Sequence, residues 1–108
     1  DQPSRLAWLA QTIPTLASTG IVYVLTQRDA DIVSRWLNIC GIDAKPYYSG
    51  VTDPEFVNER GKLDTDAYRE HLEQQLLNDK LTVLVATTAL GMGYDKPNLG
   101  FVIHFQAP

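Results

Sequence analysis

The stretch TVLVATTALGMGYDKPN, residues 82–98, leads from a continuous apolar run into a bend that contains two glycines. An uninterrupted run of strand-forming residues is typical of a strand covered on both faces, as in a parallel sheet. Gly91 and Gly93 permit backbone angles and close approaches that a side chain forbids, and Asp95 and Lys96 follow them. Because ligands of open parallel sheets lie beyond the carboxyl ends of the strands, this bend is a candidate site.

Similar apolar runs occur elsewhere in the chain, and helical patterns separate them. Pro14 is expected to end or kink the first helix, and Pro46 interrupts the second strand. Strands are predicted at residues 21–26, 42–48, 81–87 and 100–105, and helices at 3–16, at 29–40 and from residue 65 or 66 onward. Alternating helices and apolar strands predict an α/β fold with a mainly parallel, doubly wound sheet and helices on both faces.

The length and composition indicate one ordinary globular domain. The 108 residues are enough for a hydrophobic core, and 44% of them are hydrophobic while 20% are charged. No apolar run approaches the roughly 20 residues of a membrane helix, and no signal segment is visible. We therefore expect a cytoplasmic location and no membrane partner. Because the chain ends directly after a predicted strand, we also expect it to be part of a longer protein.

The charge and the sulfur and imidazole content exclude several kinds of site. The net charge of −4 is not that of a free-standing nucleic-acid binder, so any nucleic acid must meet a local site. The single cysteine, Cys40, excludes an internal disulfide. His71 and His104 lie far apart and no Cys-x-x-Cys motif accompanies them, which argues against a zinc site.

The residues around the bend have the chemistry of a phosphate and sugar site. Thr87 and Thr88 supply two hydroxyls where the strand ends, and backbone N–H groups at the start of a helical turn favour an anion. Asp95 can accept hydrogen bonds from sugar hydroxyls, and Lys96 can pair with a phosphate. The alternative is purely structural, since two glycines after a strand commonly form a tight turn and Asp-Lys-Pro can be a solvated loop.

Most of the other notable side chains are assigned structural roles. Trp8, Trp36 and Cys40 are predicted to pack in the core, since the tryptophans lie on apolar helix faces. His71 is predicted on a helix surface, whereas His104 is predicted as a satisfied histidine of a buried strand. Four acidic side chains are predicted to form a solvated face: Asp64, Asp66, Glu70 and Glu73. Residues 53–68 are predicted to form a flexible loop.

Three segments resemble the RecQ family of superfamily 2 ATP-dependent DNA helicases. VLVATTALGMGYDKPNLGFVIHF, residues 83–105, resembles that family's motif V and its flanks, and Gly-Met-Gly followed by Asp-Lys-Pro is a specific signal. GIVYVLTQRDADIVSRWLNICGI, residues 20–42, is similar to the motif IV strand and helix. KPYYSG, residues 45–50, is similar to the Tyr-His-Ala-Gly segment, so the resemblance covers residues 20–108.

The resemblance implies that residues 1–108 form the second RecA-like motor domain of such a helicase. This fold is a three-layer α/β domain with a central, mainly parallel sheet, here truncated at its C-terminus. The family moves 3′ to 5′ on DNA and binds ATP and Mg²⁺ in a cleft shared with the first RecA-like domain. Motif VI, with its arginine finger, is expected beyond Pro108. We therefore expect no catalytic residue in this fragment, no bound cofactor, and no ATP hydrolysis by the fragment alone.

The resemblance also implies roles for individual positions. In this family Gln27 is often an arginine, and the adjacent Arg28 is expected to substitute for it, while Arg69 lies where the family places an arginine. The implied nucleotide-binding residues are Gly91, Gly93, Asp95 and Lys96. The implied DNA-binding residues, mostly through phosphates, are Thr26, Arg28, Ser49, Gly50, Arg69, Thr87 and Thr88.

Two alternatives stay open at the level of the sequence. One is an RNA helicase of the same superfamily, which the wording Gly-Met-Gly-x-Asp-Lys-Pro disfavours. The other is a nucleotide- or protein-binding module without motor activity.

Overall fold

The computed structural model describes residues 2–16, 18–87 and 99–105. Its centre is a sheet of four parallel strands in the order β2-β3-β1-β4. The strands are β1 (Thr19–Tyr23), β2 (Ala44–Tyr47), β3 (Val83–Ala86) and β4 (Leu99–His104). The predicted parallel sheet is confirmed. Pro46 lies in β2, which is an edge strand, where a residue without an N–H group is tolerated.

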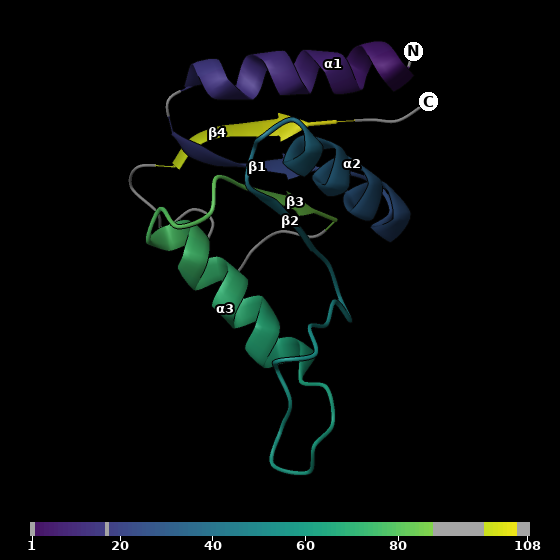
Figure 1. Cartoon of the computed structure of the whole chain (residues 1–108), viewed down its shortest axis with the longest axis vertical. Coiled ribbons are helices and arrows are strands. Elements are labelled where there is room, and N and C mark those ends of the chain that lie inside the picture. The colour runs from purple at the N-terminus through teal and green to yellow at the C-terminus, as the bar shows by residue number, and fades with distance from the viewer. Residues whose placement is uncertain (1, 17, 88–98, 106–108) are drawn as a thin grey trace.

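Helices cover the two faces of the sheet (Figure 1). Helix α1 (Gln2–Thr12) continues into the short 3-10 helix η1 (Ile13–Leu16), so the change of helix type begins one residue before Pro14. Helices α1 and α2 (Gln27–Ile39) lie on one side of the sheet, and α3 (Thr65–Leu77) lies on the other. The three-layer arrangement predicted from the sequence is therefore confirmed.

Two hydrophobic clusters hold the layers together. Strand residues alternate between them, because successive side chains point to opposite faces: Val22 joins the cluster beneath α1 and α2, and Ile21 the cluster beneath α3. The first cluster is built mainly from α1, α2 and the sheet, and the second includes Tyr68, Leu72 and Leu76 of α3. All four residues of β3 are buried, which explains its continuous apolar sequence.

Some predicted roles were wrong. Trp8 is 52% exposed, because it lies one residue from the buried Leu9 and so about 100° around the helix. Cys40 is exposed, because it is the C-cap of α2. His104 is exposed, and its ring stacks on that of Tyr23 with the ring centroids 5.3 Å apart. It is not covered because α3 packs over β2 and β3, whereas β4 is at the opposite edge of the sheet from β2.

Trp36 was predicted more accurately, as it is partly buried against the first cluster and its Nε1–H donates to the Leu6 carbonyl at 3.1 Å. His71 is exposed, as predicted. Glu73 is not part of a merely solvated face, since it accepts a hydrogen bond from the Tyr47 hydroxyl at 2.6 Å.

The segment between β2 and α3 extends away from the sheet (Figure 1). Its tip is a turn around Asn58, whose side-chain oxygen accepts from the N–H groups of Arg60 and Lys62. The segment ends at Asp64, which caps α3 by accepting from the Ala67 N–H at 3.0 Å. In the part of the chain that the structure describes, no helix is both long and apolar enough to cross a membrane.

Candidate functional site

The candidate site lies at the carboxyl edge of the sheet, where residues from three neighbouring strands meet. The sheet hydrogen bonding continues past each strand end: Thr87 N–H donates to the Tyr47 carbonyl at 3.2 Å, Val24 N–H to Ala86 at 2.9 Å, and Phe105 N–H to Tyr23 at 2.8 Å. These bonds keep the four strand ends level. Residues that follow the strands, Thr87 among them, therefore share one edge, which is the usual ligand-binding edge of a parallel sheet.

The sequence predicts Thr26 at the end of a strand, but β1 ends at Tyr23 and Thr26 lies at the start of α2. Its side-chain oxygen accepts a hydrogen bond from the Asp29 N–H at 3.0 Å, which makes it the N-cap of α2. Thr26 and Arg28 are both exposed. An exposed hydroxyl that accepts from a helix N–H still has its own proton to donate, and the positive end of the helix dipole favours an anion beside it.

Ser49 and Gly50 follow β2 and lie next to the start of α2. The Gln27 side-chain nitrogen donates to the Ser49 carbonyl at 3.1 Å, so Gln27 joins the start of α2 to this loop. Gly50 has a φ of +85°, and an added Cβ would meet nothing within 4 Å. A glycine is needed here for the backbone conformation and not because a neighbour within the described chain approaches closely.

Arg69 lies on α3, beneath β2. Its guanidinium carbon is 5.2 Å from the centre of the Tyr47 ring, a cation–π arrangement. The Nε atom of Arg69 is buried and has no hydrogen-bond partner among the described residues. The structure thus places Arg69 against Tyr47, and the predicted contact of Arg69 with DNA remains a prediction.

Two tyrosines at the end of β2 were not recognised in the sequence. The Tyr47 hydroxyl donates to Glu73 of α3, and the Tyr48 hydroxyl donates to Asp31 of α2 at 3.0 Å. Burial, and then the hydrogen bond to the neighbouring carboxylate, raises the pKa of both phenols above 10.0. Two features of the sequence could have indicated these contacts. Strand alternation sends the adjacent Tyr47 and Tyr48 to opposite faces of the sheet, and Arg69 and Glu73 are one helical turn apart, so that both can face the same strand.

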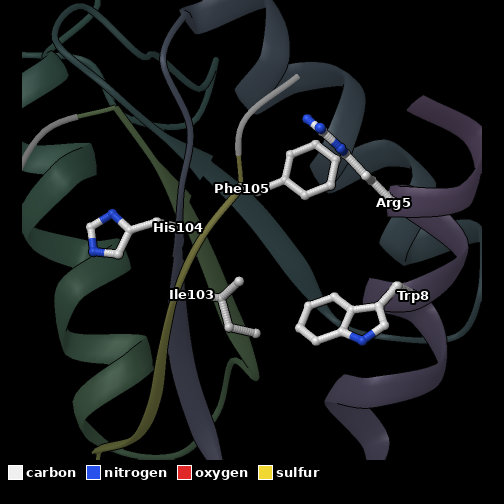
Figure 2. Close-up of a pocket in the computed structure, with 5 residues that line it drawn as sticks. All are labelled: Arg5, Trp8, Ile103, His104 and Phe105. Carbon is white, nitrogen blue, oxygen red and sulfur yellow. The ribbon is translucent and has the colours of Figure 1, made fainter. Parts of the chain in front are cut away.

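Two open pockets lie near β4. One, of about 230 Å³, lies at the carboxyl edge and is lined by Tyr23, Val24, Leu25, Thr87, His104 and Phe105. The other, of about 310 Å³, lies between α1 and β4 (Figure 2). Ile103 and Phe105 point toward Trp8 and Arg5 of α1, whereas the His104 ring points to the opposite side of β4. Trp8 thus lines this open pocket, in keeping with its exposure.

The remaining site predictions lie outside the described residues: Thr88, Gly91, Gly93, Asp95 and Lys96. The structure thus brings together Thr26, Ser49, Gly50 and Thr87 at one edge, with Arg28 in the first turn of α2. Within the part of the chain that is described, no group of three His, Cys, Asp or Glu side chains could hold a metal ion.

Comparison with solved structures supports the fold. The chain is similar to the helicase domain of Pyrococcus furiosus Hef, with a TM-score of 0.72 and 19% identity over 93% of this chain and 19% of that one. It is also similar to the C-terminal domain of the DEAD-box protein Dbp5, with a TM-score of 0.65 and 18% identity over 98% of this chain and 52% of that one. At these identities the likeness shows the RecA-like fold alone.

Comparison with curated proteins confirms the resemblance to RecQ helicases. The chain is 37% identical to the ATP-dependent DNA helicase RecQ of Bacillus subtilis (strain 168), over 82% of this chain and 13% of the relative. It is 32% identical to the ATP-dependent DNA helicase RecQ of Synechocystis sp. (strain ATCC 27184 / PCC 6803 / Kazusa), over 86% of this chain and 17% of the relative. The chain thus spans less than a fifth of the length of these relatives.

The model of the helicase conserved C-terminal domain matches residues 5–108. Since this match extends over nearly the whole chain, the chain belongs to the helicase conserved C-terminal domain family.

Proposed function

We propose that this chain is the second motor domain of a RecQ-like ATP-dependent DNA helicase that moves 3′ to 5′. In this role it contributes one wall of an ATP cleft and holds the phosphates of single-stranded DNA. The observation that carries the proposal is the shared edge at which Thr26, Ser49, Gly50 and Thr87 follow their strands. The family membership and the RecQ relatives support it.

The groups at this edge suit a translocating enzyme. Hydroxyl and backbone groups recognise phosphates, which carry no sequence information, so a motor can use the same contacts at every step along a strand. The net charge of −4 is compatible with this role if the DNA affinity is shared with other domains. Opening and closing of the cleft with ATP hydrolysis would then move the phosphate contacts of the two domains relative to each other.

The nucleotide contacts in this proposal are Gly91, Gly93, Asp95 and Lys96, which follow Thr87 within the next nine residues of the sequence. ATP and Mg²⁺ would be held jointly with the first motor domain. The bound nucleotide would supply the hydrolysable phosphate, while this chain would contribute orientation of the sugar and phosphates.

The test is ATP turnover by the full-length protein with and without single-stranded oligothymidylate. We expect DNA to stimulate turnover, and we expect Asp95→Ala to lower it at least about tenfold, as loss of a charged substrate contact does. Asp66→Ala, which removes an exposed carboxylate from the first turn of α3, is the matched control and should be near wild type. Unchanged turnover in Asp95→Ala would count against that residue as a nucleotide contact.

Two further measurements bear on the proposal. Stimulation by oligouridylate as strong as by oligothymidylate would favour an RNA helicase instead. The isolated chain should show no micromolar nucleotide binding by calorimetry, because half of the proposed pocket belongs to the other domain. Micromolar binding by the isolated chain would contradict a shared cleft.

A further inference from the structure

Two consecutive tyrosines tie the end of β2 to helices on both sides of the sheet. Tyr47, which is 1% exposed, donates its hydroxyl proton to Glu73 of α3 at 2.6 Å. Tyr48 donates to Asp31 of α2, at 3.0 Å to one carboxylate oxygen and 3.3 Å to the other. Hydrogen bonds to carboxylates are stronger than those between neutral groups. The end of β2 is therefore bonded to α3 on one face of the sheet and to α2 on the other.

The backbone of the same segment is bonded to the candidate edge residues. The Tyr47 carbonyl accepts the Thr87 N–H, and the Tyr48 carbonyl accepts the Val51 N–H at 3.1 Å. The Ser49 carbonyl accepts from Gln27, next to the cap of α2. A displacement of the two tyrosines would thus displace Thr87 and Ser49 with them.

Arg69 confines the Tyr47 ring from the α3 side. The guanidinium lies over the ring, and Glu73 is one helical turn further along α3. Arg69 and Glu73 are at the (i, i+4) spacing at which side chains of one helix face are neighbours. The aromatic ring, the cation and the carboxylate therefore form one packed unit beside the strand end.

We propose that Tyr47 and Tyr48 are positioning residues for the phosphate contacts of this domain, with Glu73, Arg69 and Asp31 as their anchors. They hold the loop at Ser49 and Gly50 and the end of β3 at Thr87 at a fixed spacing, which a row of phosphates requires. The inference rests on the proposed function for its role in DNA binding. Its structural part, that the two hydroxyls fix the Thr87 and Val51 amides, stands independently.

The experiment uses the full-length protein that carries this chain, with the double variant Tyr47→Phe, Tyr48→Phe. The oligothymidylate concentration for half-maximal ATPase stimulation should rise about five- to tenfold, as expected for loss of one or two net hydrogen bonds. The KM for ATP should stay within about twofold, because these residues do not contact the nucleotide in the proposal. Equal loss of DNA and ATP affinity would overturn the positioning role.

Hydrogen exchange supplies a readout that does not depend on DNA. In the same variant the amides of Thr87 and Val51 should exchange about tenfold faster, since local opening becomes easier while the rest of the sheet keeps its protection. Unchanged exchange at these two amides would overturn the inference even if the protein is a DNA helicase. If the wild-type protein shows no DNA stimulation, the proposed function fails, and the exchange measurement still decides the structural part.

Three further variants separate positioning from general stability. Glu73→Gln keeps an oxygen that accepts the Tyr47 proton and should retain near wild-type DNA half-saturation, whereas Glu73→Leu should raise it like Tyr47→Phe. Tyr68→Phe is the matched control, because Tyr68 is a buried tyrosine of the same cluster whose ring lies beside the rings of Phe56 and His71. A rise in DNA half-saturation with Tyr68→Phe as large as with Tyr47→Phe would show that any loss in this core suffices, which contradicts the inference.

Discussion

The side chain of Thr26 combines two roles, and most substitutions would remove both of them at once. It caps α2 through the Asp29 N–H, and it is the proposed donor to a DNA phosphate. A carboxylate can replace the hydroxyl as a cap but cannot approach a phosphate without repulsion. Substitution with aspartate therefore separates helix stability from DNA binding at one position.

We expect Thr26→Val to lower the free energy of unfolding by about 1 kcal/mol, and Thr26→Asp to change it by less than about 0.5 kcal/mol. Thr26→Asp should nevertheless weaken oligothymidylate binding more than Thr26→Val does, while Thr26→Ser should stay near wild type for both quantities. Denaturant melting and DNA titration of the full-length protein measure the two effects. If Thr26→Asp binds DNA like wild type, Thr26 is a cap alone.

Among the elements, the pairing of β1 with β4 depends on a close approach at Gly20. Gly20 is opposite Phe101 in the sheet register, and a Cβ added to Gly20 would lie 2.5 Å from both the ring and the carbonyl oxygen of Phe101. No rotation of the Phe101 side chain moves that carbonyl oxygen. A methyl group at position 20 must therefore separate the two strands, which would disturb the level edge at Tyr23 and Phe105.

We expect Gly20→Ala to destabilise the domain by about 1–3 kcal/mol, the usual range for an overpacked interior. Gly61→Ala is a useful comparison, since its φ of +75° is unfavourable for alanine but nothing lies within 4 Å of the added Cβ. That variant should cost about 1 kcal/mol through backbone strain alone. Amide exchange of Phe105, which donates to Tyr23, should speed up in Gly20→Ala only. Equal protection in both variants would refute strand separation.

At the scale of the whole molecule, the sequence predicts the layers better than the contacts between them. The parallel sheet could be predicted because residues 83–86 are buried on both faces, which leaves a continuous apolar signature. The exposure of His104 could not be predicted from the sequence, because it depends on which strands α3 covers. The contact of Tyr47 with Glu73 joins residues 26 positions apart and depends on the packing angle of α3. The four predicted nucleotide-binding residues, Gly91, Gly93, Asp95 and Lys96, all lie outside the described residues, so that prediction stays untested.

Two buried tyrosines, Tyr47 and Tyr68, and the partly buried Tyr48 make the stability of the fold depend on alkaline pH. Burial is the main cause that raises the pKa of Tyr47, Tyr48 and Tyr68 above 10.0, and hydrogen bonds to Glu73 and Asp31 and the charge of Asp53 add to it. Since these groups have a higher pKa in the folded chain than in the unfolded chain, their neutral forms contribute stability that is fully present below pH 10. This contribution is lost as the pH rises through the folded-state values.

We therefore expect the free energy of unfolding to fall as the pH rises above 10, with three tyrosines ionising together with unfolding instead of before it. Phenolate absorbance and circular dichroism, followed in one titration of the isolated chain, measure ionisation and unfolding side by side. Glu73→Gln removes a negative charge beside Tyr47 and should lower the pKa of that phenol toward 10.0, while Tyr48 and Tyr68 keep theirs. Ionisation of all the tyrosines near pH 10 in a chain that stays folded would contradict the burial of these rings, and with it the anchoring of β2 between α2 and α3.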